Sequence, residues 1–354
     1  MNRPILLTGA TGFLGSRLCH SLLIAQPGDI HCLVRGRTPA GGERRLHARL
    51  DIPDELRHRI VVVPGDVRLP RLGLSEVDFR ELAATVGAVY HCAASVNLAA
   101  DYERLAPANV EGSRNVLALA QRGEHHLHYV STLGVFLAGR AVGLPKVTED
   151  TEPSWESAGE IGYCRTKLVA ERELLASGVP LTIYRPGLVT GDTRTGECSG
   201  SDVVARIIRA AAALRAAPET TGEVCVGSVD FTARAIAALS LRPDAAGRTH
   251  HPVEEQAFPM SRLFDHLATA REPLERVDVG GWHRRLTEAP DSSAAFVLLA
   301  VWRAARHLLA ETEIAASPAF DVTQTRTVLA DEGVDTSVLD EPYFHRMIRR
   351  IITP

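Results

Sequence analysis

The chain has 354 residues, of which 45% are hydrophobic and 23% are charged, and its formal net charge is −4. This composition supports a sizeable buried core and excludes an intrinsically disordered chain. The lack of a strong positive charge disfavours nucleic acid as a partner. The longest apolar run, Ala294–Trp302, is much shorter than the about 20 residues that cross a bilayer, so we expect no membrane span and no membrane partner.

The N-terminus leads into an apolar strand without the hydrophobic stretch of a signal peptide. The six cysteines are scattered and include no Cys-x-x-Cys pair. This pattern is typical of reduced thiols in a cytoplasmic protein, and it predicts neither a disulfide framework nor a metal site. At ordinary domain sizes, the length predicts about two lobes.

The first 190 residues alternate short apolar runs with segments of helical periodicity. We expect strands at Pro4–Thr8, Asp29–Val34, Arg59–Pro64, Ala88–His91, His126–Ser131 and Leu181–Arg185. We expect helices at Leu14–Leu23, Glu43–Leu50, Val77–Thr85, Asn109–Arg122 and Tyr163–Ala176. This alternation predicts an α/β fold, with a doubly wound parallel sheet of the Rossmann type and helices on both faces.

The pattern loosens after the sixth expected strand. Ser201–Ala217 predicts a helix, and Val224–Ser228 predicts a strand that returns to the main sheet and leads into a helix at Val229–Ser240. Beyond Ala257 the chain is mostly helical in pattern, most strongly at Ala294–Ala310. We expect a dinucleotide-binding domain made of residues 1–190 and 224–252, and a smaller, mostly helical lobe for substrate and carrier made of residues 191–223 and 253–354.

A glycine-rich turn, Thr8–Gly15, lies between the first expected strand and the first expected helix. Its three glycines recur at every third position, which permits a tight turn and a close approach of backbone N–H groups to a pyrophosphate at a helix N-terminus. A plain glycine turn is the alternative, but the strand–turn–helix context favours dinucleotide binding. The residues expected at the cofactor are Gly9, Thr11, Gly12, Phe13, Leu14 and Gly15.

The second expected strand runs into Arg35 and Arg37, where an NAD site usually carries an acidic residue for the ribose 2′-hydroxyl. Arg44 and Arg45 follow in the next expected helix. Guanidinium groups match a 2′-phosphate in charge and geometry. Ordinary surface arginine is the alternative, because the chain has 37 arginines and two lysines, but the missing carboxylate favours NADP(H).

Two further strand ends carry residues suited to a cofactor. Asp66 and Val67 follow the third expected strand and are placed to approach an adenine, and Ala93 and Ala94 follow the fourth, where small residues let a cofactor lie close to the backbone. Ordinary loop residues are the alternative for both pairs.

Tyr163 and Lys167 stand four positions apart in an expected helix and therefore lie on one face of it. An ammonium group beside a phenol stabilises the phenolate and lowers the tyrosine pKa, so that tyrosine can act as a general acid near neutral pH. With six tyrosines and two lysines in the chain, a chance pair at this spacing is improbable. A solvated helix face is the alternative.

Thr132 follows Ser131 at the end of the fifth expected strand, in the crevice where ligands of doubly wound sheets bind. Its hydroxyl can hydrogen-bond a substrate carbonyl alongside the tyrosine. Asn109 begins an expected helix, where it either caps the helix or holds a water molecule near Lys167.

Together these motifs resemble the extended short-chain dehydrogenase/reductase superfamily and, more narrowly, the thioester reductase domains that end nonribosomal peptide and polyketide assembly lines and carboxylic acid reductases. The segments that carry the resemblance include Thr8–Gly15, Cys32–Arg35, Gly65–Val67, Leu72–Leu74, His91–Asn97, Asn109–Gly112, Tyr129–Thr132, Gly162–Lys167 and Arg185–Gly187. Thr166–Leu168 replaces the family's Ser-Lys-Trp, and Asp101–Tyr102 replaces its Pro-Tyr. The resemblance implies NADP(H) as cofactor, and it implies a catalytic set of Thr132, Tyr163, Lys167 and Asn109 and further cofactor contacts from Tyr163, Lys167, Arg185, Pro186 and Gly187.

The resemblance implies NADPH-dependent reduction of an acyl thioester to an aldehyde, with a second hydride giving the alcohol. The sequence has no Gly-Gly-x-Ser carrier attachment site and no room for an adenylation domain, so we expect a stand-alone enzyme whose substrate comes on a carrier protein in trans or as a coenzyme A ester. A reductase, epimerase or dehydratase for a small ketone, aldehyde or sugar nucleotide is one alternative, and a non-catalytic NADP sensor is another. Arg346, Arg349 and Arg350 form either a solvated helix face or a docking patch for an acidic carrier.

Overall fold

The computed structural model describes residues 3–36, 38–199, 203–270, 273–288, 317–336 and 339–352. In these residues a seven-stranded sheet has the order β11-β7-β5-β4-β1-β2-β3, and every pairing in it is parallel. Its strands are β1 (Ile5–Thr8), β2 (Ile30–Val34), β3 (Ile60–Pro64), β4 (Ala88–His91), β5 (His126–Val130), β7 (Leu181–Tyr184) and β11 (Thr249–His250). The expected doubly wound parallel sheet is confirmed.

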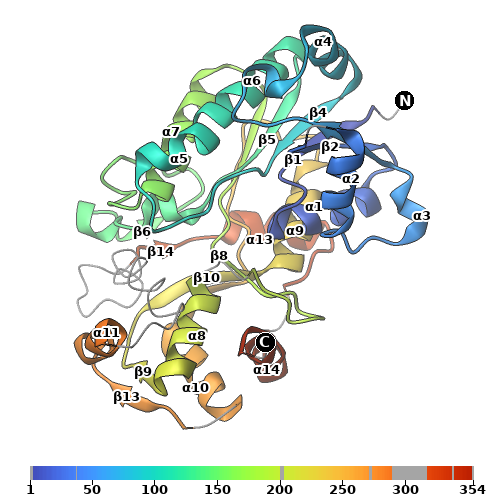
Figure 1. Cartoon of the computed structure of the whole chain (residues 1–354). Helices are drawn as coiled ribbons and strands as arrows, with labels where there is room; N and C mark the ends of the chain where they lie inside the picture. The colour runs from blue at the N-terminus through green and yellow to red at the C-terminus, as the bar shows by residue number, and fades with distance from the viewer. Residues whose placement is uncertain are drawn as a thin grey trace.

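Helices cover both faces of this sheet, as Figure 1 shows. They are α1 (Phe13–Ala25), α2 (Pro39–His47), α3 (Asp54–Arg57), α4 (Glu76–Thr85), α5 (Tyr102–Asn109), α6 (Glu111–Gly123), α7 (Gly162–Ala176) and α9 (Val229–Ser240). Successive strand residues point to opposite faces, so Ile5 and Leu7 of β1 pack in the core with α1 and α9, whereas Leu6 packs in the core with α4, α6 and α7. Burial on both faces explains why these strands are almost continuously apolar.

A second sheet combines β8 (Leu188–Thr190), β10 (Glu223–Ser228) and β12 (Glu255–Pro259), with β10 between the other two. The expectation that residues 224–228 return to the main sheet is therefore wrong, and β11 occupies that edge instead. The reason lies just after β7, where the chain at Gly187 comes so close to β10 that a Cβ atom there would lie 2.3 Å from the Cys225 carbonyl oxygen. This close approach aligns β8 with β10, and Val226 pairs with Leu188.

The smaller part of the molecule is built around α8 (Val203–Leu214), α10 (Met260–Ala270), α11 (Val279–Glu288) and α14 (Glu341–Ile352), as Figure 1 shows. The helix expected over 201–217 ends at Leu214, because Arg215 has a φ of 50° and the chain then forms a strand. The remaining elements are β9 (Ala216–Pro218), β13 (Glu275–Val277), β6 (Lys146–Val147), β14 (Ala319–Phe320), α13 (Thr323–Asp331) and the 3₁₀ turns η1 (Pro70–Gly73), η2 (Leu133–Phe136) and η3 (Arg140–Val142).

The apolar segment Ala294–Ala310 lies outside the described residues, and the division into residues 1–190 with 224–252 and 191–223 with 253–354 stays a prediction. Among the helices that the structure does describe, none combines the length and the apolar character needed to cross a bilayer.

Candidate active site

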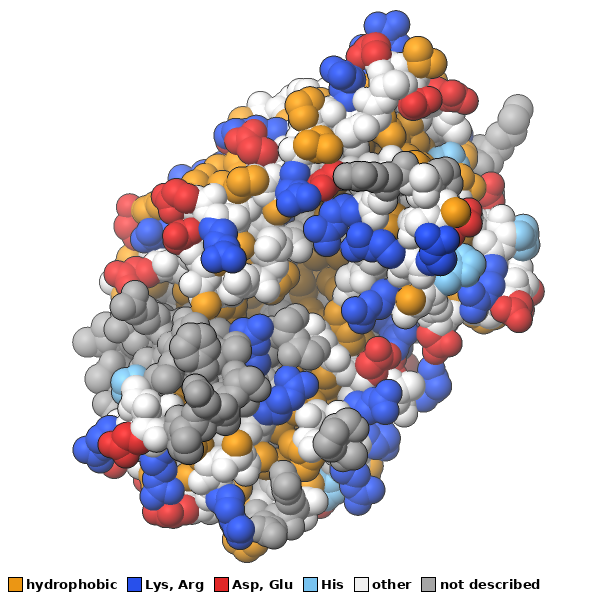
Figure 2. All heavy atoms as spheres, in the orientation of Figure 1, with side chains coloured by type: hydrophobic (Ala, Val, Ile, Leu, Met, Phe, Trp, Pro, Cys, Tyr) orange, Lys and Arg blue, Asp and Glu red, His pale blue; other side chains and the backbone are white. Residues whose placement is uncertain are grey.

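A cavity of about 590 Å³ opens where the main sheet meets the smaller part. The face drawn in Figure 2 is hollowed near its centre, with hydrophobic side chains in the hollow and Lys and Arg side chains beside it. The predicted site residues that line the cavity are Gly9, Gly12, Phe13, Leu14, Gly15, Ala94, Thr132, Tyr163, Pro186 and Gly187. The fold thus brings together residues from the carboxyl ends of β1, β4, β5 and β7, which is the crevice expected in a doubly wound sheet.

The glycine turn forms a tight cradle between β1 and α1. Gly9 has a φ of 83°, and a Cβ atom on it would lie 2.7 Å from the Ala93 backbone nitrogen. A Cβ atom on Gly15 would lie 2.1 Å from the Gly9 carbonyl oxygen, so neither position accepts another residue without a shift. No acidic side chain lies in the first turn of α1, which leaves its N-terminus open to an anion. The cradle therefore fits the pyrophosphate of a dinucleotide.

A buried hydrogen-bond chain supports the cradle from behind, and sequence reasoning did not identify it. The Ala93 N–H donates to Thr8 Oγ1 (3.2 Å), and the Thr8 hydroxyl contacts His91 Nδ1 (2.7 Å). On the other side of the ring, His91 Nε2 contacts Ser113 Oγ (3.1 Å), whose hydroxyl donates to the Asn109 carbonyl (2.6 Å). Burial, aided by the charge of Lys167, lowers the pKa of His91 to about 3, so the ring is neutral. A neutral ring with its proton on Nε2 satisfies every bond of this chain.

The residues expected around the adenine and the 2′-phosphate lie in the loops after β2 and β3, outside the cavity lining. Arg35 is exposed, and Arg45 donates to its carbonyl oxygen (3.1 Å). Asp66 accepts from Arg68 (2.6 Å), and this bond lowers the pKa of the Asp66 carboxyl, with a smaller contribution from the charge of Arg35. Asp66 and Arg35 thus belong to one electrostatic neighbourhood, although Arg37 lies outside the described residues.

Tyr163 lines the cavity from the first turn of α7. Burial raises its pKa well above the ordinary value, with smaller contributions from Cys164 and Cys92. The expectation that Lys167 lowers this pKa is therefore wrong for the structure, because the loss of hydration of the phenolate dominates. A raised pKa keeps the phenol protonated at neutral pH, which is the form that can donate a proton.

Lys167 lies beneath the cavity floor and is 2% exposed. Its Nζ donates to the Val130 carbonyl oxygen (2.6 Å) and lies 4.0 Å from the centre of the Tyr129 ring, a cation–π geometry. Burial lowers the pKa of the amine to about 7, against the opposing charges of Cys92 and Glu171. The amine therefore changes its charge near neutral pH.

Two hydroxyl groups stand side by side at the end of β5. Thr132 lines the cavity, and its Oγ1 accepts from the Gly134 N–H (3.0 Å). The structure adds Ser131, which also lines the cavity, is 2% exposed and has no hydrogen-bond partner for its Oγ within the described part of the chain. A buried hydroxyl without a partner is costly, so this position fits a polar group of a bound cofactor or substrate.

Asn109 ends α5 instead of beginning a helix, and Val110 is the N-cap of α6, so the expected capping role is wrong. The Asn109 side chain accepts from the Ser95 N–H (2.7 Å) and donates to the Ser95 carbonyl (3.2 Å) and to Thr166 Oγ1 (2.9 Å). These bonds tie the loop after β4 to α7, just before Lys167. The expected role in holding a water molecule stays a prediction.

The Arg185 side chain turns away from the cavity, which corrects the expectation that it contacts the cofactor. Its Nη2 lies 2.8 Å from Glu171 Oε2, and its Nε contacts both carboxylate oxygens of Glu171. Both side chains are almost fully buried, and Arg185 also stacks over Phe136. The pair fixes α7 against the end of β7, and it leaves Pro186 and Gly187 to line the cavity.

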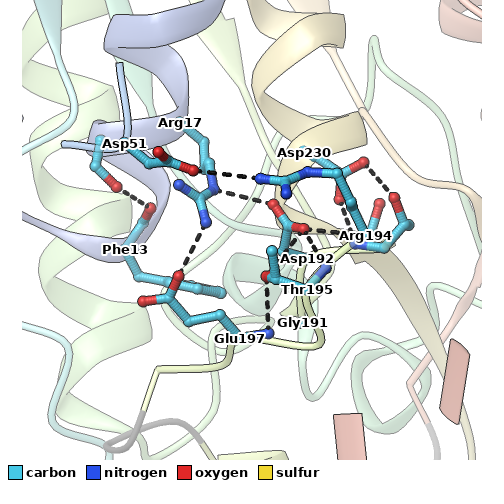
Figure 3. A network of polar contacts seen from close by, with 12 residues as sticks. Phe13, Arg17, Asp51, Gly191, Asp192, Arg194, Thr195, Glu197 and Asp230 are labelled. Atoms are coloured by element: carbon cyan, nitrogen blue, oxygen red, sulfur yellow. Dashed lines mark hydrogen bonds and ion pairs between the residues drawn. The ribbon is translucent and has the colours of Figure 1, made fainter. Parts of the chain in front are cut away.

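A polar network that no sequence spacing could reveal joins α1 to the loop after β8 (Figure 3). Arg17 contacts Asp192 Oδ2 (3.1 Å) and Glu197 Oε2 (3.0 Å), which are about 180 residues away in the sequence. Asp192 also accepts from the backbone N–H groups of Arg194 and Thr195 (3.0 and 2.8 Å). The network fixes this loop beside the helix that carries the glycine cradle.

The C-terminal arginines behave differently from one another. Arg346 donates to the Thr193 carbonyl (2.8 Å) and so holds the same loop. Arg349 and Arg350 are exposed in the last turn of α14. Docking of a carrier on this helix stays a prediction.

The parallel seven-stranded sheet, with a glycine cradle at the carboxyl ends of its strands, defines an oxidoreductase of the extended short-chain dehydrogenase/reductase class that binds a dinucleotide cofactor. The family described as "Male sterility protein" (NAD_binding_4) matches residues 7–236, and the chain belongs to this family.

Known structures and sequences agree with this assignment. The terminal R domain from the myxalamid PKS-NRPS pathway is 33% identical with a TM-score of 0.89, and the match covers 99% of this chain and 90% of that one. The reductase (R) domain of a nonribosomal peptide synthetase from Mycobacterium tuberculosis is 25% identical with a TM-score of 0.78, over 99% and 91% of the two chains. The expected resemblance to terminal reductase domains is confirmed.

Curated relatives are much longer than this chain. One subunit of the linear gramicidin synthase from Brevibacillus parabrevis is 36% identical over 80% of this chain, and the match spans 6% of that protein. Isonitrile lipopeptide synthase from Streptomyces coeruleorubidus is 33% identical over 99% of this chain, and the match spans 24% of that protein. The similarity therefore concerns one reductase-type domain of these proteins.

Proposed function

We propose that the protein uses NADPH to reduce an acyl thioester to an aldehyde and a free thiol. The observation that carries the proposal is a single cavity lined both by the glycine cradle and by Thr132 and Tyr163. A dinucleotide and a carbonyl substrate can meet there beside two hydroxyl groups. Similarity to terminal reductase domains supports a thioester as the substrate, carried by a protein or by coenzyme A.

The chemistry asks little of the protein beyond hydrogen bonding and positioning. When bound, NADPH supplies the hydride. Tyr163 is protonated at neutral pH and donates its proton to the thioester oxygen as negative charge develops there. Thr132 Oγ1 accepts from Gly134, which leaves its hydroxyl proton free to donate to the same oxygen. The resulting hemithioacetal expels its thiol, which takes up a proton, and the aldehyde remains.

Lys167 and Asn109 act behind these two residues. Lys167 is held under the end of β5 by Val130, and a pKa of about 7 suits an amine that returns a proton to Tyr163. Asn109 positions the loop after β4 and, through Thr166, the first turns of α7. We assign Lys167 to the proton path and Asn109 to positioning.

The preference for NADPH rests on the arginines after β2. Arg35 is exposed at the end of that strand, Arg44 and Arg45 follow in α2, and no carboxylate stands between Val34 and Glu43 to bind a ribose 2′-hydroxyl. Guanidinium groups at this position favour a 2′-phosphate.

A substrate panel tests the proposal. The protein is incubated with NADPH and, separately, with acyl-coenzyme A, an acyl-pantetheine, a small ketone and a nucleotide sugar, and the loss of NADPH is followed with mass analysis of products. We expect NADPH oxidation with the thioesters, coupled to release of thiol and aldehyde. Turnover of the ketone or the nucleotide sugar, with none of the thioesters, contradicts the proposal.

A further inference from the structure

The cavity contains two arginines that the proposed chemistry does not use. Arg140 comes from η3 and Arg206 from α8, and both line the cavity. Arg140 is exposed and Arg206 is half-buried. Neither has an ion-pair or hydrogen-bond partner among the residues that the structure describes, so two guanidinium groups from distant segments share one space without a counter-charge.

Their surroundings make this arrangement unusual for the molecule. The neighbouring positions of α8 are buried and apolar, and Val203 and Val204 line the cavity beside Arg206. On the same helix, Arg209 donates to the Ile351 carbonyl oxygen, and Arg17 on α1 has two carboxylate partners. A guanidinium that loses hydration without gaining a partner is destabilised, and a bound anion removes that cost.

One carboxylate, Glu223, also lines the cavity, but it forms no ion pair with Arg140 or Arg206 in the described structure. The charges that line the cavity are therefore two positive and one negative. Hydride transfer to a thioester requires none of them, because Tyr163 and Thr132 already serve the carbonyl oxygen. The three charges are left for recognition of the rest of the substrate.

We propose that Arg140 and Arg206 form a binding site for an anionic group of the substrate, either the phosphate of its pantetheine arm or a carboxylate on its acyl chain. This inference rests on the proposed function. Planar guanidinium groups pair with both phosphate and carboxylate, so the structure assigns the charge of the ligand, and the experiment distinguishes its source.

The test uses four thioesters on one scaffold. They are acyl-pantetheine with a neutral chain, its phosphorylated counterpart, acyl-pantetheine with a terminal carboxylate on the acyl chain, and the compound with both anions. Each is assayed with the unmodified protein and with the variants Arg140→Gln, Arg206→Gln and Glu223→Gln. The control is Arg122→Gln, which changes an exposed arginine on α6 outside the cavity lining.

We expect Arg140→Gln and Arg206→Gln each to raise KM about tenfold or more for the substrates that carry the recognised anion. The value of kcat, and KM for the neutral compound, should stay within about twofold, because the hydroxyl groups at the carbonyl are untouched. Glu223→Gln should lower KM for the same anionic substrates, and added salt should raise it. A selective effect on the phosphorylated pair identifies phosphate, and one on the carboxylated pair identifies carboxylate.

Equal effects on neutral and anionic substrates, or no effect on any of them, overturn the anion site while leaving thioester reduction intact. Failure of the unmodified protein to reduce any of the four compounds contradicts the proposed function itself. NADPH titration verifies that each variant is folded. Should Arg206→Gln fail this check, Arg140→Gln decides the question, because Arg140 is exposed and has no described contact to lose.

Discussion

Lys167 donates a hydrogen bond of 2.6 Å to the backbone carbonyl oxygen of Val130, the last residue of β5. Val130 directly precedes Ser131 and Thr132, so this bond joins α7 to the strand end that carries both hydroxyl groups of the cavity. The lysine has no ion-pair partner among the described residues, and its environment is a carbonyl and an aromatic ring. The amine is therefore held in place without a carboxylate that would fix its charge.

The first prediction concerns the pH dependence of stability. The lysine pKa is about 7 in the folded protein and 10.5 ordinarily, so between these values the unfolded chain binds a proton that the folded chain lacks. The free energy of unfolding should therefore rise with pH from about 7 to 8.5, by up to about 1.4 kcal/mol per pH unit. Lys167→Met should remove this rise. Urea unfolding at several pH values measures it, and parallel curves for the two proteins would contradict the buried amine.

The second prediction concerns the proton donor. Tyr163→Phe should lower kcat by about 10²–10⁴-fold and leave NADPH affinity nearly unchanged, because it removes one hydroxyl and little volume. Tyr102→Phe, at the start of α5 and outside the cavity lining, is the matched control and should keep full activity. Near-normal turnover in Tyr163→Phe would remove the tyrosine from the mechanism.

The third prediction concerns the glycine cradle. Gly15→Ala should abolish measurable cofactor binding, because its Cβ would lie 2.1 Å from the Gly9 carbonyl oxygen, a backbone atom that cannot move aside cheaply. Gly12→Ala should be milder, since its Cβ would lie 3.2 Å from the same oxygen. Fluorescence titration with NADPH measures both. Equal losses in the two variants would show that the close approach at Gly15 is not decisive.

The fourth prediction concerns cofactor choice. Arg35→Ala should weaken NADPH binding about tenfold or more and leave NADH binding almost unchanged, because a charge-assisted contact to the 2′-phosphate is lost. Arg49→Ala, an exposed arginine two residues beyond α2, serves as the control. If the unmodified protein binds NADH as well as NADPH, the arginine interpretation is wrong.

The fifth prediction concerns the buried pair behind α7. Arg185→Met and Glu171→Leu should each lower the free energy of unfolding by about 3–5 kcal/mol, because each leaves a buried charge without its partner. The double variant should be more stable than the sum of the two losses predicts. Additive losses would show that the two side chains do not depend on each other. Denaturant unfolding of all four proteins completes the cycle.

Much of the fold follows from local sequence pattern. Apolar runs of four or five residues, separated by helical periodicity, predicted the six strands of the first 190 residues to within about two residues, because a buried parallel strand must be apolar on both faces. The glycine turn was equally predictable, since its spacing meets a local steric demand. Tyr163 and Thr132 were found because each stands at the end of such an element.

Only the tertiary structure decided which of these elements meet. The sheet that β10 joins depends on the close approach at Gly187, which no periodicity encodes. The same holds for Arg185, whose charge is satisfied by Glu171 in the core instead of by a ligand, and for Arg17, whose partners lie about 180 residues away. A sequence states which side chains carry charge or a hydroxyl. Whether a charge faces solvent, a counter-charge or a cavity depends on chain segments that come together only on folding, and burial then sets pKa values such as that of Lys167.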